Sequence, residues 1–257
     1  MNLGSLHFCN VADASVLNGQ TVDQFLAIAN NQLGGGAAPF GTAVTALIAR
    51  QVNEAFVDGV PSPFAQESLR VGGCGWTNGE MRTFTQFAYG DPTTAGGAVL
   101  ISNYNSLYGV TDLVVGGINT MRFTSATAVF TYLPAIGAPA SLSGNLLNPL
   151  TSSSGEFGGQ VLALQLNVDF SGSGAIPSAM DLGSLYICNY ALVPQVNGQT
   201  VDQFLTTANS LLGGGSASFG SGAASIVATE INSAFINGVP SPFAQSNLFD
   251  GACPLAP

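Results

Sequence analysis

Residue types that could do chemistry are scarce in this chain. Its single histidine, His7, is the first candidate for a catalytic or metal-binding role. A Ser-His-Asp arrangement would have to be built around that one imidazole. The chain holds no Gly-x-Ser-x-Gly turn that could present a nucleophile. Tyr186 takes the same place 179 residues later, within closely similar sequence. Since a His–Tyr exchange is typical of a half-buried strand position, we expect a structural role for His7.

Two carboxylates, Asp23 and Asp202, stand at one position of the same repeated stretch and could act as general acids or bases. Each is expected at the second position of a helix, where the helix dipole favours a negative charge. The run Leu33–Gly36 follows that helix instead of opening it, and the chain contains no lysine. The run is therefore not a phosphate-binding loop. We predict structural roles for all of these residues.

Metal and ligand sites have weak signals. Turn carboxylates at Asp58, Asp91 and Asp112 lack the spacing of a calcium loop. The cysteines form no Cys-x-x-Cys pair, which disfavours zinc and redox motifs. We predict no catalytic residue, no metal site and no cofactor. Six aromatic side chains could stack on sugars, although most are expected in the core: Trp76, Tyr89, Tyr104, Tyr108, Tyr132 and Tyr190.

The organisation of the chain is dominated by an internal repeat. Residues 1–76 align with residues 180–255 at a constant offset of 179, and 41 of the 76 positions are identical. This divides the chain into copy 1 (1–76), a middle segment (77–179) and copy 2 (180–257). The order predicts either a window from a longer tandem array or an extra half-unit that engages a neighbouring subunit.

The four cysteines follow the same offset, because Cys9 aligns with Cys188 and Cys74 with Cys253. Three pairings are open to four cysteines. The duplication favours Cys9–Cys74 and Cys188–Cys253, with four buried free thiols as the alternative. Each bridge would close a loop of roughly 65 residues, worth about 4 kcal/mol in the chain-entropy model.

Each copy predicts a strand followed by a pair of helices. Leu3–Cys9 and Leu182–Cys188 are short extended runs. Thr21 and Thr200 are N-caps, each with a glutamine three residues later that completes a capping box. Glycines end the first helix. The second helix is expected over Ala43–Val57 in copy 1 and Gly222–Ile236 in copy 2, followed by a proline-containing loop.

The middle segment has mixed patterns, so the expected fold class is α+β, with the duplicated module flanking a mixed α/β segment. Ser153 and Glu156 resemble a capping box before Gly159–Phe170, whose pattern fits a strand or a helix, and we favour a helix. The other expected elements are a strand at Arg82–Tyr89, a helix at Ala98–Tyr108, strands at Thr111–Val115 and Thr120–Thr124, a helix at Ser125–Leu133 and a loop at Ala135–Ser154.

Composition restricts the partners and the location. Charged residues make up 7% of the chain, against about 25% in a typical soluble domain. Four arginines, no lysine and a net charge of −10 exclude the phosphate contacts that nucleic-acid binding requires. No apolar run is long enough to predict a membrane-spanning helix. The first residues lack the charged and apolar regions of a signal peptide, yet low charge and paired cysteines predict export.

Several stretches resemble an uncharacterised module of large secreted bacterial surface proteins. The resemblance covers residues 77–257, and 1–76 for its second half, and is carried by Thr85-Gln86, Ala98–Tyr108, Phe123–Ala126, Gly159–Val168, Leu182–Leu185 and Asn197–Val201. It implies an extracellular, multi-copy, non-catalytic part. It supplies no catalytic, metal or cofactor residue.

The first functional hypothesis is a secreted structural protein, not an enzyme, that assembles head to tail into a filament or surface layer. One copy packs on the middle segment of its own chain and the other is left for a neighbour. The expected joint is a strand donated from Leu3–Cys9, through the residues Leu3, Ser5, Leu6, His7 and Phe8. The alternative is an adhesion or glycan-binding module that uses aromatic side chains near Trp76 and Tyr89. A hydrolase is the third class, for which no paired carboxylates stand out.

Overall fold

The structure is a computed structural model that describes residues 2–9, 11–70, 75–251 and 253. About 49% of it is helix and 9% strand, which confirms the α+β class. Its internal contacts divide the chain into two units, one of residues 1–75 with 249–257 and one of residues 76–248. Each unit is described separately below. No helix within the described residues is long and apolar enough to cross a membrane.

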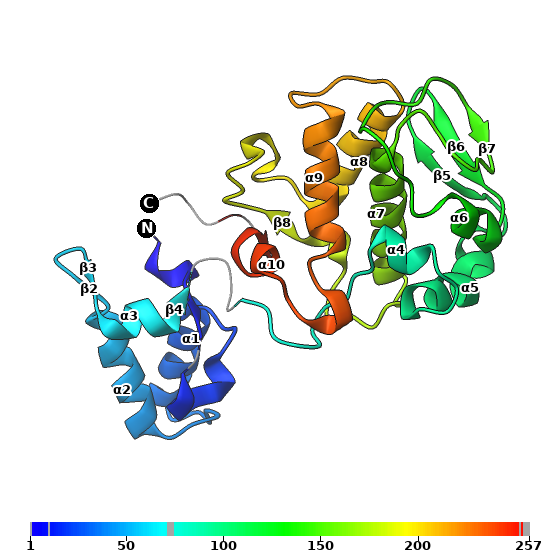
Figure 1. Cartoon of the computed structure of the whole chain (residues 1–257). Coiled ribbons are helices and arrows are strands. Elements are labelled where there is room, and N and C mark those ends of the chain that lie inside the picture. The colour runs from blue at the N-terminus through cyan, green and yellow to red at the C-terminus, as the bar shows by residue number, and fades with distance from the viewer. Residues whose placement is uncertain (1, 10, 71–74, 252, 254–257) are drawn as a thin grey trace. The chain divides into compact units, whose positions relative to one another are not determined.

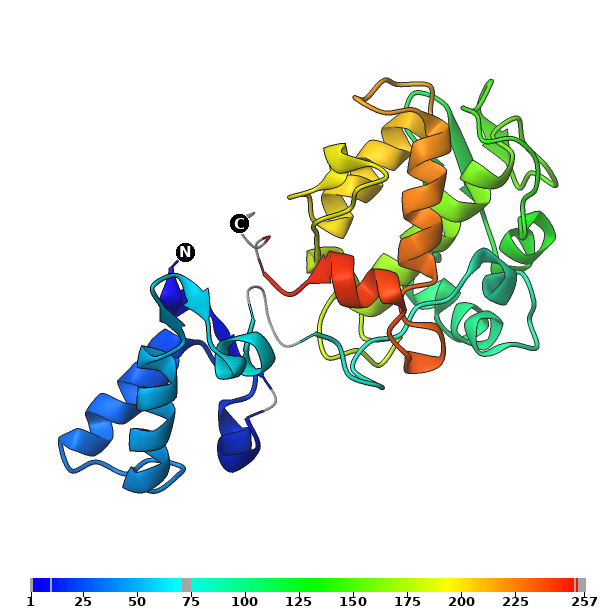
Figure 2. The ribbon, with the colours of Figure 1, turned by 60° about the vertical axis from the view of Figure 1, so that its left-hand side comes forward.

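The first unit is built on the side-by-side helices α1 and α2, drawn in blue in Figures 1 and 2. Its core is small, with Phe8, Phe25 and Ile48 almost completely buried. Strand β1 pairs antiparallel with β4, and β2 pairs with β3 in a hairpin. Its elements are β1 (His7–Phe8), α1 (Val22–Leu33), α2 (Thr42–Asn53), β2 (Phe56–Val57), β3 (Val60–Pro61), α3 (Pro63–Ser68) and β4 (Leu69–Arg70).

The second unit is arranged around one buried helix, α7, which contacts α8 and α9 on one side and β5 of a small three-stranded sheet on the other (Figure 1). In that sheet β5 and β6 are antiparallel, and β6 and β7 are parallel. Its elements are α4 (Gln86–Tyr89), α5 (Ala95–Tyr108), β5 (Leu113–Gly116), β6 (Thr120–Phe123), α6 (Ala126–Tyr132), β7 (Leu146–Leu147), α7 (Glu156–Gly172), β8 (Tyr186–Ile187), α8 (Val201–Leu212), α9 (Ser221–Asn232), α10 (Pro242–Asn247) and β9 (Leu248–Phe249).

Corresponding residues of the two copies form corresponding elements. The backbone N–H of Gln24 donates to the Thr21 hydroxyl at 3.2 Å, and the Thr21 N–H donates to the Gln24 side chain at 2.8 Å. Thr200 and Gln203 form the same two bonds, at 3.2 and 2.9 Å respectively. Both predicted capping boxes are therefore confirmed, and each satisfies two backbone donors at the start of a helix.

The extended runs predicted at the start of each copy are shorter than expected. Leu3–Ser5 and Leu182–Ser184 are 3-10 turns, and each turn is capped by the preceding Asn2 or Asp181 side chain. Only the two residues of β1 and of β8 are strand. The second helices also end early, at Asn53 and Asn232, so the predictions to Val57 and Ile236 were too long.

The middle segment follows most of its predictions. The helices expected at Ala98–Tyr108 and Ser125–Leu133 correspond to α5 and α6, and the two expected strands to β5 and β6. The helix favoured over Gly159–Phe170 is confirmed by α7. Its predicted capping box is wrong, because Gly155 is the N-cap and makes no side-chain bond. The loop expected at Ala135–Ser154 contains the short strand β7.

The strand predicted at Arg82–Tyr89 is also wrong. Residues 82–85 belong to no strand, and Gln86–Tyr89 forms the helical turn α4. The Thr85 hydroxyl caps this turn by accepting from the Ala88 N–H at 3.3 Å. A threonine N-cap is a local signal that outweighs the weak apolar alternation of this stretch.

Candidate functional site

Copy 2 contacts the middle segment through both helices of its pair, α8 and α9. On α8, the Asn209 side chain accepts from the Gly116 N–H at 2.7 Å and donates to the Gln165 amide oxygen at 3.2 Å. At the end of the same helix, the carbonyl of Gly213 accepts from the Asn119 N–H at 3.0 Å. Helix α8 is therefore fixed to the β5–β6 turn by backbone and amide bonds together.

Asn232, on α9, is fully buried and bonds two side chains of the middle segment. Its amide nitrogen donates to the main-chain and side-chain oxygens of Gln160, each at 3.0 Å. Its oxygen accepts from Asn167 at 2.9 Å. Asn167 in turn bonds the main-chain N–H and carbonyl of Phe84. Every polar atom of the Asn232 amide group has a partner, so this buried network costs little and fixes the register of α9 on α7.

The loop after α9 completes the interface. Thr83 and Phe235 exchange two hydrogen bonds of 3.0 and 3.2 Å, and the Gly79 N–H donates to the Gly238 carbonyl at 2.8 Å. The Trp76 ring meets the Phe235 ring edge-on, with centroids 5.2 Å apart. Here copy 2 holds the start of the middle segment through its main chain.

Copy 1 carries the same residues at the equivalent positions, yet they are exposed. Leu33 is 86% exposed where Leu212 is fully buried. Leu26 is 45% exposed where Leu205 is 5% exposed. Asn53 is exposed where Asn232 is buried. We call the following residues the copy 1 face: Leu26, Asn30, Leu33, Gly34 and Asn53, which match Leu205, Asn209, Leu212, Gly213 and Asn232.

Gly34 is the most informative residue of the copy 1 face. Its φ of −76° is open to any residue, and an added Cβ would meet only carbonyls of its own helix, at 3.5 Å or more. In copy 2, a Cβ on Gly213 would lie 2.2 Å from the Gly117 nitrogen and 2.5 Å from its Cα. Glycine is thus needed at this position only where the middle segment is docked.

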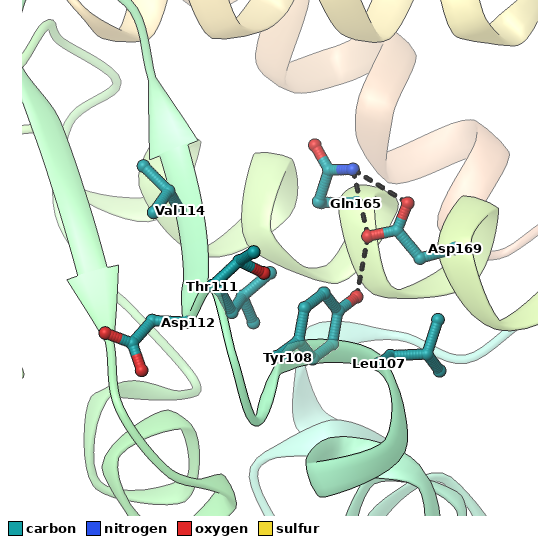
Figure 3. Close-up of a pocket in the computed structure, with 8 residues that line it drawn as sticks. Leu107, Tyr108, Thr111, Asp112, Val114, Gln165 and Asp169 are labelled. Atoms are coloured by element: carbon teal, nitrogen blue, oxygen red, sulfur yellow. Dashed lines mark hydrogen bonds between the residues drawn. The ribbon is translucent and has the colours of Figure 1, made fainter.

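A pocket in the second unit lies beside the same interface, between α5, β5 and α7 (Figure 3). The Tyr108 hydroxyl donates to Asp169 at 2.6 Å, and the Gln165 amide donates to both oxygens of that carboxylate at 3.0 and 3.1 Å. Burial raises the pKa of Asp169 and of Tyr108. Because Gln165 also bonds Asn209, the pocket carboxylate is part of a chain of contacts that connects α5 to copy 2.

The residues singled out from the sequence lie in a strand pair, in the first turns of helices and in packed aromatic contacts. His7 pairs with Arg70 in the β1–β4 ladder, and burial lowers the pKa of its imidazole. Asp23 and Asp202 lie in the first turns of α1 and α8, as predicted. Tyr89 is fully buried, and Trp76 packs on Phe235 and donates its indole N–H to the Leu248 carbonyl at 2.9 Å. These two aromatics do not form an exposed surface for stacking on sugars.

The expected assembly strand is already paired within the chain. Leu6 and Phe8 are buried, at 2% and 0% exposure. One edge of β1 pairs with β4, and on the other edge the Phe8 N–H donates to the Gln20 carbonyl at 2.8 Å. Leu3 and Ser5 belong to the 3-10 turn. Since both edges are occupied, donation of Leu3–Cys9 to a neighbour would first have to break these bonds.

The cysteines agree with the duplicated pairing where the structure describes them. Cys188 and Cys253 lie at disulfide distance. Cys9 is also disulfide-bonded, and its expected partner, Cys74, lies outside the described residues. A disulfide and the lack of a membrane-spanning helix within the described residues are compatible with a secreted protein.

Sequence reasoning missed the copy 1 face, since identity between the copies does not reveal which one is covered. The available signal was a glycine kept at positions 34 and 213, although the glycine that follows each of them, Gly35 or Gly214, is the one with the positive φ of a helix end. Among the described residues, no three His, Cys, Asp or Glu side chains lie close enough to hold a metal. Comparisons with protein-family models, curated proteins and solved structures gave no match for this chain.

Proposed function

We propose that the chain is a structural subunit of an extracellular filament or surface layer, which associates through the copy 1 face. The single observation that carries this proposal is the exposure, in copy 1, of the side chains that copy 2 uses to hold the middle segment. An exposed leucine by itself is ordinary. Identical residues at five such positions, including a glycine that the unit itself does not require, are the pattern of an interface.

Composition supports association of this kind. The copy 1 face is apolar and amide-bearing, without a charge among its five residues. Its burial would desolvate no ion, and leucine burial contributes about 2 kcal/mol per side chain. Contacts of this type depend weakly on salt. The disulfides suit a subunit that remains folded outside the cell.

The surface also gives the assembly a direction. The copy 1 face lies on one helix pair, and what it would bind lies elsewhere on a neighbouring molecule, so the contact is heterologous. Heterologous contacts form open filaments or layers unless their rotation closes a ring. No catalytic constellation enters this proposal, because the Asp169 carboxylate of the pocket is held by Tyr108 and Gln165.

The test compares two leucine-to-aspartate variants of the full oxidised chain. Leu33→Asp places a charge in the copy 1 face, and Leu150→Asp places one at a leucine that is 70% exposed in the second unit. Sedimentation velocity and negative-stain microscopy over a concentration series should show assembly of the wild type and of Leu150→Asp, and monomers of Leu33→Asp. A wild type that stays monomeric, or a Leu33→Asp variant that assembles equally well, would refute the proposal.

A further inference from the structure

We infer that the copy 1 face binds residues 76–179 of a second copy of the chain, in the way that copy 2 binds them within its own chain. This inference rests on the proposed function and names its partner. Each member of the copy 1 face has a counterpart in copy 2 that the second unit buries or holds by hydrogen bonds. The second chain would thus exchange its own copy 2 for copy 1 of a neighbour.

The polar part of the match rests on one asparagine of each helix, Asn53 on α2 and Asn30 on α1. Asn53 can replace Asn232 between Gln160 and Asn167 of the second chain, since both are asparagines at the last position of their helices. Asn30 can replace Asn209, which bonds Gly116 and Gln165. A buried asparagine network accepts few other side chains, since each would leave an amide without a partner.

The steric part of the match depends on Gly34 and Leu33. The β5–β6 turn approaches Gly213 so closely that no Cβ fits there, and Gly34 offers the same bare backbone. Leu33 would fill the place of the fully buried Leu212. Phe56 corresponds likewise to Phe235, which pairs with Thr83. The receiving surface is therefore complementary to copy 1 in shape as well as in hydrogen bonding.

Three sequence differences between the copies explain why the middle segment binds copy 2 of its own chain in preference to copy 1 of a neighbour. Ala46 replaces Ser225, whose hydroxyl bonds Glu156 at 3.3 Å. Gln32 replaces the buried Leu211, and its amide donates to Phe40 within copy 1. Arg50 replaces Thr229. In addition, a tethered copy acts at an effective concentration on the order of millimolar. The tethered copy therefore occupies the middle segment at low chain concentration, and copy 1 of a neighbour displaces it only as the chain concentration rises toward that value or when the contact of copy 2 is weakened.

The experiment weakens copy 2 in the full oxidised chain and asks whether copy 1 takes its place. Asn232→Ala removes the amide that bonds Gln160 and Asn167, while Asn53 remains able to supply one. Oligomers should form at about 100 µM, with at least about a tenfold larger oligomer fraction than in the wild type. Adding Gly34→Ala to Asn232→Ala should abolish them, because the new methyl group meets the β5–β6 turn. Gly34→Ala alone should remain monomeric at that concentration.

A second weakening variant covers the case in which Asn232→Ala fails to fold. Gly213→Ala pushes copy 2 away from Gly117 without touching the buried amides, and it should show the same dependence on Gly34. Size-exclusion chromatography with light scattering measures all variants. The inference is overturned if a folded Asn232→Ala or Gly213→Ala chain stays monomeric, or if either oligomerises equally with alanine at position 34.

Failure of this inference differs visibly from failure of the proposed function. If Leu33→Asp prevents wild-type assembly while the exchange variants do not depend on Gly34, the copy 1 face associates with a surface other than residues 76–179. In that outcome the inference is overturned and the proposed function stands. If the wild type does not assemble and Leu33→Asp has no effect, the proposed function is refuted as well.

Discussion

Copy 1 and copy 2 share 41 of 76 residues and the same order of helices, yet the same leucine is 86% exposed in one and fully buried in the other. The difference comes from the middle segment, which covers copy 2 within the second unit. Local sequence determines the helix pair, its caps and its disulfide positions. Burial of the outer face is determined by what is packed against it, which the sequence of the copy itself does not contain.

The loops after the second helices illustrate this point. In copy 1, Phe56–Pro61 folds back as the β2–β3 hairpin. In copy 2, the equivalent residues include a 3-10 turn at Ile236–Gly238, and Phe235 and Gly238 bond the middle segment instead. Backbone groups that lack a partner elsewhere pair with each other, and they change partners when a better-placed strand or loop is present.

The largest difference in stability effect between the copies is expected for alanine substitutions at the equivalent leucines Leu33 and Leu212. Leu212→Ala should destabilise the second unit by about 3 kcal/mol, because it removes a fully buried side chain and leaves a cavity. Leu33→Ala should change the stability of the first unit by less than about 0.5 kcal/mol. Urea unfolding followed by Trp76 fluorescence reports the second unit, since that ring packs on Phe235. Circular dichroism reports both units. Equal effects of the two substitutions would mean that copy 1 is covered in the monomer.

Alanine substitutions at the equivalent glycines Gly34 and Gly213 should change the stability of their units in opposite directions. Gly213→Ala should destabilise the second unit by about 2 kcal/mol, because its methyl group meets the Gly117 backbone. Gly34→Ala should stabilise the first unit by about 0.5 kcal/mol, because its φ suits alanine and the unfolded chain becomes less flexible. Thermal unfolding of each variant against the wild type measures both. A loss of stability in monomeric Gly34→Ala would remove the argument that this glycine serves an interface.

The parts of the fold that were predictable have strong local signals. The capping boxes located α1 and α8, and helical spacing of apolar residues located α5. Helix α7 was ambiguous, because almost every one of its side chains is buried, including Gln160 and Asn167, so no polar face marks its period. The pairing of β1 within the chain was not predictable, since an alternating run such as Leu3–Cys9 gives no information on whether its edges have partners.

The candidate site was predictable only in outline. The duplication around one middle segment indicated that one copy lacks a partner, and this is the difference in burial that the structure has. The participating side chains could not be found, because asparagines and leucines on a helix are ordinary residues until their neighbours are known. Asn232 becomes distinctive only beside Gln160 and Asn167, which come from a different part of the chain.

The smallest expected effect is a difference in pH dependence between the two units. Burial lowers the pKa of His7, so the unfolded chain takes up a proton more readily below about pH 6.5. The first unit should therefore lose stability as the pH falls from that value. Burial raises the pKa of Asp169 and Asp202. The folded second unit accordingly binds protons more tightly than its unfolded chain, and should gain stability as the pH falls through the raised folded values toward about 4.

Substitutions at these groups should remove each trend separately. His7→Tyr, which installs the residue that copy 2 has at position 186, should flatten the profile of the first unit and leave the second unchanged. Asp169→Asn should reduce the gain in stability of the second unit at low pH to the part that Asp202 contributes, because an amide keeps the contact with Tyr108 without a titrating proton. Unfolding between pH 4 and 7, followed by Trp76 fluorescence and by circular dichroism, separates the two transitions. Parallel profiles in the wild type would mean that the units unfold as one, and the contrast between the copies would then be confined to their surfaces.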